Sequence, residues 1–189
     1  MLRGMGARLV GAVRRLGEGG WGLSRARSVA REVATSKAAV RTLVAVMFGT
    51  DAELRKRAAD VARRVTEQGA GPLWGYADEL AGLLAEIDPG ERRTRWHLGL
   101  VVARVAHTHE QRLRAGRLMQ LLGQDEGNVV RCSAIEGLGL LACAEESLRV
   151  IAEEMAEQAL RSGTKAERCR ARESLKRMRR AGALEGGTL

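Results

Sequence analysis

A chain of 189 residues is long enough for one sizeable hydrophobic core and short for two independent ones. Two prolines, five aromatic residues and many alanines, leucines and arginines favour helices that pack through small and aliphatic side chains. No apolar run approaches eighteen residues, which excludes an integral membrane span, and three widely spaced cysteines do not form a disulfide framework. No secretory signal is recognisable, so we expect a cytoplasmic protein.

The net charge of +9 is concentrated at the two ends of the sequence. Residues 1–50 carry a net +7, residues 51–160 a net −4, and residues 161–189 a net +6. Phosphate binding needs an accumulated positive surface. The acidic central segment therefore disfavours nucleic acid as a partner.

Residues 1–19 form the first predicted element, a basic amphipathic helix. Apolar residues recur every three to four positions from Leu2 to Leu16, and no acid precedes Glu18. Three interpretations stay open: a helix that caps the first repeat, a segment (residues 1–18) that binds an anionic membrane surface or a partner's groove, and an organelle transit segment. The last would replace the cytoplasmic location with an organelle.

Hydrophobic periodicity then predicts nine helices in residues 20–180, as in the series Leu54, Ala58, Val61 and Val65. Their predicted ranges are 23–34, 37–48, 52–68, 75–86, 91–106, 110–122, 126–142, 146–161 and 164–180. Glycine and proline fall between them, for example at Pro89-Gly90. Residues 181–189 are predicted to be a flexible tail.

The helices form an internal repeat. Four short polar residues recur at a spacing of thirty-seven, and each is predicted to begin a helix: Asp51, Asp88, Asp125 and Ser162. An arginine follows each by six or seven residues: Arg57, Arg95, Arg131 and Arg168. The octapeptides at 131–138 and 168–175 share five of eight residues in the same phase. We count four helix pairs, the first and last incomplete.

The third unit resembles the first helix of HEAT repeat proteins, an armadillo-type family. The matching residues are Asp125, Val130, Arg131, Ala134, Leu138, Gly139 and Leu141. The resemblance covers about residues 37–180 and implies a right-handed α-superhelix, or solenoid, of about four helix pairs. It also implies that the repeated acids and arginines (Asp51, Arg57, Asp88, Arg95, Asp125, Arg131 and Arg168) form a structural ladder between adjacent units.

No motif in the sequence predicts a catalytic, metal or cofactor site. His107 and His109 are two residues apart, so on a helix their rings diverge and cannot share a metal. HEAT-type deoxyhypusine hydroxylases bind iron through several His-Glu pairs, whereas this chain has one. The cysteines Cys132, Cys143 and Cys169 lack the paired spacing of a zinc site.

The sequence therefore predicts a non-catalytic scaffold that binds a protein partner on its helical surface. The expected contact residues lie on the second helices of the units: Asp78, Glu79, Arg114, Arg117 and Glu154. The alternatives are association with a membrane surface through residues 1–18 and a nucleic-acid-binding protein. The latter would be similar to HEAT-like alkylpurine DNA glycosylases, with Trp74 and Trp96 near Asp78, Glu79 and Asp88.

Overall fold

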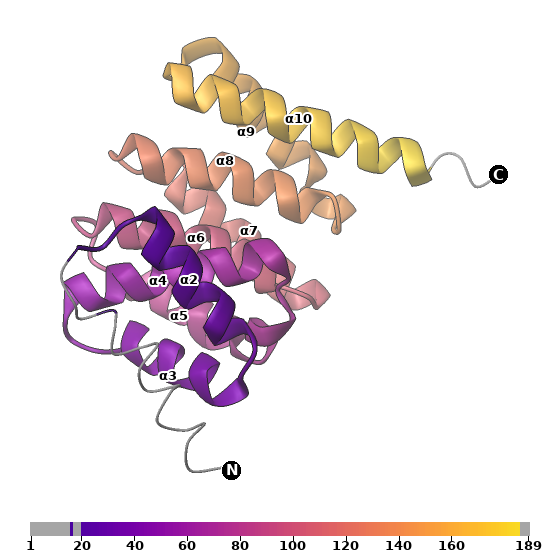
Figure 1. The fold of residues 1–189 in the computed structure, drawn as a ribbon. Helices are drawn as coiled ribbons and strands as arrows, with labels where there is room; N and C mark the ends of the chain where they lie inside the picture. Colours follow the sequence, from indigo (N-terminus) through magenta and orange to yellow (C-terminus); the bar gives the residue numbers. More distant parts are fainter. Residues whose placement is uncertain (1–15, 17–19, 186–189) are drawn as a thin grey trace.

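The computed structural model of the chain describes residue 16 and residues 20–185 (Figure 1). Within this part every regular element is helical, which confirms the all-α prediction. The α-helices are α2 (Leu23–Ala34), α3 (Lys37–Met47), α4 (Ala52–Gln68), α5 (Ala77–Glu86), α6 (Arg92–Val105), α7 (His109–Leu122), α8 (Asn128–Ala142), α9 (Arg149–Ser162) and α10 (Lys165–Glu185). Two short 3-10 helices, η1 (Gly71–Tyr76) and η2 (Glu146–Leu148), precede α5 and α9.

The α-helices are arranged in two rows. Helices α2, α4, α6, α8 and α10 pack side by side in chain order, and we call them the first row (Figure 1). The second row consists of α3, α5, α7 and α9, which pack on the first row: α3 on α2 and α4, α5 on α6, α7 on α6 and α8, and α9 on α8 and α10. The first-row helices are therefore the continuous part of the array.

One hydrophobic cluster extends along the array, from Leu16 and Val29 to Met178. Small residues bring the helices close together within it. A Cβ atom on Gly139 of α8 would lie only 2.7 Å from the Cβ atom of Ser174 in α10. The buried Ser174 hydroxyl donates a hydrogen bond to the Ile135 carbonyl oxygen at 3.1 Å. Helix α10 is thus fixed against α8 by close backbone approach as well as by apolar packing.

Asp51 begins a helix as predicted, because its carboxylate accepts the Glu53 and Leu54 backbone N–H groups at the start of α4. The same prediction is wrong for Asp88, Asp125 and Ser162. Asp88 and Asp125 each accept an N–H within the turn before the helix, from Gly90 at 2.6 Å and Gly127 at 2.7 Å. A short polar residue two positions from a glycine stabilises a turn as readily as a helix start.

Ser162 is the last residue of α9, where its hydroxyl donates to the Gln158 carbonyl oxygen. The start of α10 is capped instead by Thr164 and Glu167. The Thr164 N–H donates to the Glu167 carboxylate at 2.6 Å, and the Glu167 N–H donates to the Thr164 hydroxyl at 3.3 Å. This reciprocal arrangement is a capping box.

The two ends of the chain differ in what the structure describes. Helix α10 continues to Glu185, beyond the helix end predicted at residue 180, and the flexibility expected of residues 181–189 stays a prediction. Residues 186–189, and nearly all of the predicted N-terminal helix (1–15 and 17–19), lie outside the described residues. In the part that the structure describes, no helix combines the length and apolar character that a membrane crossing requires.

Candidate partner-binding surface

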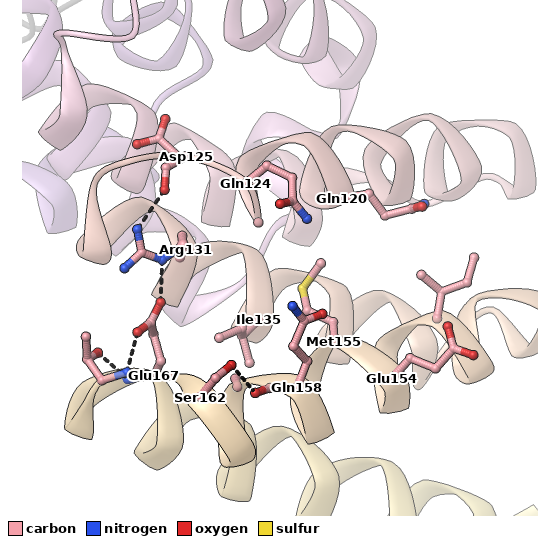
Figure 2. A pocket seen from close by; sticks show the side chains of 15 residues that line it. Gln120, Gln124, Asp125, Arg131, Ile135, Glu154, Met155, Gln158, Ser162 and Glu167 are labelled. Atoms are coloured by element: carbon pink, nitrogen blue, oxygen red, sulfur yellow. Dashed lines mark hydrogen bonds and ion pairs between the residues drawn. The ribbon is translucent and has the colours of Figure 1, made fainter.

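Arginine side chains join the N-terminal ends of neighbouring first-row helices, and we call these contacts the terminal ladder. Arg55 of α4 pairs with Glu91 before α6, and Arg95 of α6 pairs with Asp125 before α8. Arg131 of α8 pairs with Glu167 of α10 at 2.5 Å (Figure 2). Four of the five first-row helices, from α4 to α10, are thus linked by charged hydrogen bonds.

The arginines of this ladder also bind the loops at the starts of the helices. Arg55 donates to the Gly49 carbonyl oxygen at 2.6 Å, and Arg131 donates to the Asp125 carbonyl oxygen at 2.7 Å. Burial tends to raise the pKa of Glu167, but its hydrogen bonds from Arg131 and Thr164 outweigh that effect and lower the pKa. These contacts stabilise the arrangement of adjacent units.

The structure brings together three of the seven residues predicted for a ladder, Arg95, Asp125 and Arg131. Of the other four, Asp51, Asp88 and Arg168 act within one helix or turn, and Arg57 also reaches the segment before α2. Asp51 and Asp88 accept local backbone N–H groups, and Arg168 donates to the Gly163 carbonyl oxygen at 2.6 Å. Arg57 pairs with Glu53 in its own helix and donates to the Leu16 carbonyl oxygen at 2.7 Å.

The sequence reasoning missed Arg55, Glu91 and Glu167 as ladder residues. One signal for them exists in the sequence. Arg55 and Glu91 are thirty-six residues apart, and so are Arg131 and Glu167. The two partners of such a contact are thirty-six residues apart, one fewer than the repeat of thirty-seven. A search for Arg and Glu at a spacing of thirty-six would find both pairs.

A second set of polar contacts, the lateral ladder, joins the first-row helices further along their length. Arg63 of α4 donates to His97 Nδ1 of α6 at 3.1 Å. Arg104 of α6 donates to Glu136 of α8 at 3.2 Å, and Arg170 of α10 lies 3.7 Å from the same carboxylate. Glu136 is therefore shared between arginines of two neighbouring helices.

The pKa of His97 depends on its burial and on the charges beside this ladder. Its side chain is buried, and burial is the main reason why its pKa is lowered to about 4. Asp60 opposes the shift, whereas the arginines of α4 and α6 around it (Arg63, Arg64 and Arg93) add to it. The imidazole is therefore neutral at pH 7 and accepts the Arg63 hydrogen bond at Nδ1.

Asp60 lies beside two arginines of α4 without completing their hydrogen bonds. Its Oδ1 atom lies 3.0 Å from Arg64 Nε and 3.6 Å from Arg63. The approach to Arg64 lacks the direction of a hydrogen bond, so neither Asp60 Oδ1 nor Arg64 Nε has a hydrogen-bond partner among the described residues. Asp60 still balances the charge of Arg64, and Glu67 pairs with Arg63, so the positive charge in excess where α4 meets α6 comes from Arg93, which makes no ion pair with a described residue.

The two rows differ in charge. The first-row helices carry, from α2 to α10, net charges of +2, +2, +4, 0 and +5, a total of +13. The second-row helices carry +2, −3, +2 and −1, a total of zero. The net −4 of residues 51–160 is a sum in which the acids of α5 and of the segments between helices outweigh the basic first-row helices. Glu91, Asp125 and Glu126 lie outside the helix bounds but pair with first-row arginines, which leaves the first row a net +10. A count along the sequence therefore does not describe the charge of the first-row surface.

The predicted contact residues of the second row are only partly brought together. Asp78 of α5 pairs with Arg114 of α7 at 2.7 Å, and both side chains are more than half exposed. Glu79 and Arg117 are exposed and make no ion pair with a described residue. Glu154 of α9 lies apart from them. It lines a pocket of about 570 Å³ whose walls come from α7, α8, α9 and α10 (Figure 2).

Trp74 and Trp96, the tryptophans expected in a glycosylase-like site, each stack on a histidine. Trp74 of η1 stacks on His107 with ring centroids 5.4 Å apart. Trp96 of α6 stacks on His97 at 4.3 Å, and the Arg63 guanidinium lies 5.6 Å from its ring. Of the acids expected beside them, Asp78 is paired with Arg114.

No disulfide joins Cys132, Cys143 and Cys169 to one another, and burial raises the pKa of Cys132. Among the described residues, no three His, Cys, Asp or Glu side chains are placed to hold a metal ion together. No protein-family model, no curated protein and no solved structure matches this chain.

Proposed function

We propose that this protein is a non-catalytic HEAT-like scaffold that binds a protein partner. In this proposal the two rows of helices wind as a right-handed, armadillo-type superhelix of about four helix pairs. The observation that carries the proposal is the concentration of positive charge on the first row, +13 against zero on the second row. A surface of one charge attracts and orients a partner of the opposite charge.

The two ladders support this function because they fix the surface before a partner arrives. Arg63, Arg104 and Arg170 are held by partners on neighbouring helices, so little side-chain freedom is left to lose on binding. Arginine is also enriched among the residues that dominate protein interfaces. We therefore assign the partner to the first-row surface, and the predicted second-row contacts (Asp78, Glu79, Arg114, Arg117 and Glu154) become the alternative.

Affinity capture from a lysate of the source cells, with three forms of the full chain, tests the proposal. The first form is the wild type. The second reverses three exposed first-row arginines (Arg27→Glu, Arg31→Glu and Arg93→Glu). The third makes the same charge change on the second row (Arg41→Glu, Arg117→Glu and Arg161→Glu). All six side chains are exposed.

We expect one stoichiometric protein with the wild type and the second-row variant, and its loss with the first-row variant. Loss from the second-row variant alone would move the site to the predicted second-row contacts. Capture of nucleic acid, or of no specific protein, would overturn the proposal.

Nucleic acid is the second candidate partner, because the charge of the first row favours it more than the sequence count does. A phosphodiester backbone would release counterions from many arginines, so its binding would weaken steeply with salt. Against it, Arg104 and Arg170 of the first row already share the Glu136 carboxylate within the lateral ladder. Association with membranes through residues 1–18 stays a prediction, and so does the cytoplasmic location. Sedimentation with anionic vesicles, with and without residues 1–18, tests the first.

A further inference from the structure

A hollow of about 630 Å³ lies between α2 and α4, and we call it the α2–α4 hollow. Three of the side chains that line it are arginines from two helices, Arg27 and Arg31 of α2 and Arg64 of α4. The remaining lining residues are Leu23, Ser24, Glu67 and Gln68. Glu67 is the one acid in this lining.

The positive charge of the hollow is not compensated within the described part of the chain. Arg27 and Arg31 are exposed and make no ion pair there. They are four residues apart on α2, where two like charges destabilise a helix by roughly 0.2–0.5 kcal/mol. Glu67 cannot neutralise them fully, because it is already the partner of Arg63.

Arg64 adds a donor to the same hollow. Its charge is balanced by Asp60, but its Nε atom is buried and has no hydrogen-bond partner among the described residues. An oxygen atom of a ligand in the hollow would relieve that deficit if the guanidinium group turned toward it. The Ser24 hydroxyl and the Gln68 amide supply further donors at the edge.

We propose that the α2–α4 hollow binds the phosphate monoester of a phosphorylated side chain on the protein partner, an inference that rests on the proposed function. The guanidinium groups of Arg27 and Arg31, which no described residue compensates, match the charge of about −1.5 to −2 that a phosphate monoester carries at pH 7. A carboxylate or a phosphodiester carries one negative charge and would neutralise half of them. The planar fork of arginine also fits pairs of phosphate oxygens.

Arginines beside the hollow could bind the part of the partner that flanks its phosphate. Arg64 belongs both to the hollow and to the group of arginines around His97, which includes Arg93 of α6. A peptide anchored by its phosphate between α2 and α4 would therefore meet further positive charge along α6. Arg63, Arg64 and Arg93 each add to the lowering of the His97 pKa, of which burial is the main cause.

The test uses the full chain and short peptides observed by nuclear magnetic resonance. The probes are an acetylated, amidated Gly-phosphoserine-Gly peptide and its serine and aspartate counterparts. We expect the phosphopeptide to shift the arginine Nε–H signals of Arg27, Arg31 and Arg64 saturably, and the aspartate peptide to bind at least about fivefold more weakly. Absence of a saturable shift with the phosphopeptide would overturn the inference.

Two matched double variants locate the binding. Arg27→Gln with Arg31→Gln should weaken phosphopeptide binding at least about tenfold, since two charged hydrogen-bonding groups are lost. Arg41→Gln with Arg117→Gln removes the same charge from the second row and should leave the affinity within about twofold. Equal losses in both variants would mean a general charge effect and would overturn the site.

A twelve-nucleotide single strand and vesicles containing phosphatidylserine serve as competing probes. If either shifts the same arginine signals more tightly than the phosphopeptide does, the hollow belongs to nucleic acid or to lipid and the inference fails.

Phosphatase treatment of the lysate before capture separates this inference from the proposed function. Loss of the captured partner after treatment supports both. Retention of the partner overturns the inference and leaves the scaffold function standing. Phosphopeptide binding without any captured protein partner would overturn the scaffold function and leave phosphate binding in the hollow standing.

Discussion

Gly139 and Gly82 are both inside helices, but the space around them differs. A Cβ atom on Gly139 would lie 2.7 Å from Ser174 Cβ, whereas a Cβ atom on Gly82 would have no neighbour within 4 Å. We expect Gly139→Ala to destabilise the fold, because overpacking costs about 1–3 kcal/mol and outweighs the gain of about 1 kcal/mol in helix propensity. Gly82→Ala should stabilise it by about 1 kcal/mol. Urea unfolding measures both, and a gain at Gly139 would contradict the close α8–α10 approach.

His97 makes the stability depend on pH. Its pKa is about 4 in the folded chain against 6.5 for an unperturbed histidine, because its burial disfavours the charged form. Between these values the unfolded state binds a proton that the folded state does not, so stability is full above pH 6.5 and falls as the pH drops toward 4. The loss amounts to up to about 3 kcal/mol. His97→Gln should remove this part of the pH profile, and an unchanged slope in the variant would contradict the assignment.

At the scale of elements, the start of α10 depends on Glu167. This carboxylate accepts hydrogen bonds from Thr164 in its own capping box and from Arg131 of α8, and 6% of its side chain is exposed. Glu167→Gln keeps the shape but replaces a charged hydrogen bond by a neutral one, so we expect a loss of about 1–2 kcal/mol at pH 7. Since the folded pKa is lowered, this stabilisation is present above pH 4.5 and disappears as the pH falls below it.

Hydrogen exchange should show the loss first in α10, because the capping box and the Arg131 contact both act at its start. The control is Glu173→Gln on the same helix. Glu173 is about half exposed and pairs with Arg170 at 2.8 Å, so this change should cost less than about 0.5 kcal/mol. An equal effect of the two substitutions would show that the terminal ladder does not stabilise α10.

The helices were largely predictable from local chemistry, and the predicted ranges 23–34 and 52–68 coincide with α2 and α4. In α4, the cap at Asp51 and the helical spacing of the apolar residues both predict a helix that begins at residue 52. The predictions from 75 and 146 failed at their starts, because the chain before α5 and α9 forms the 3-10 helices η1 and η2. Helix termini often tighten in this way, and apolar spacing does not distinguish the two helix types there.

At the scale of the whole molecule, the candidate surface could not be predicted from the order of residues alone. Arg27, Arg31 and Arg64 come from helices separated by α3, and only the packing of α2 on α4 brings them to one hollow. The charge of the two rows is a property of the same packing, because alternate helices enter different rows. Arg63 and His97 are thirty-four residues apart, close to the repeat, but nothing in their local sequence marks them as a pair.

The charge of the first row also predicts how salt affects folding. Like charges about 10 Å apart repel by about 0.4 kcal/mol in water, and the row holds a net +13. Raising the ionic strength from 10 to 100 mM shortens the screening length from about 30 Å to about 10 Å, which reduces this repulsion, whereas half-buried ladder pairs are screened less. We therefore expect added NaCl to stabilise the chain by about 1 kcal/mol in urea unfolding.

Arg27→Gln with Arg31→Gln should reduce that gain, because both arginines lack a compensating ion pair in the described part of the chain. Destabilisation by salt would mean instead that the ladder ion pairs dominate the electrostatics of the fold.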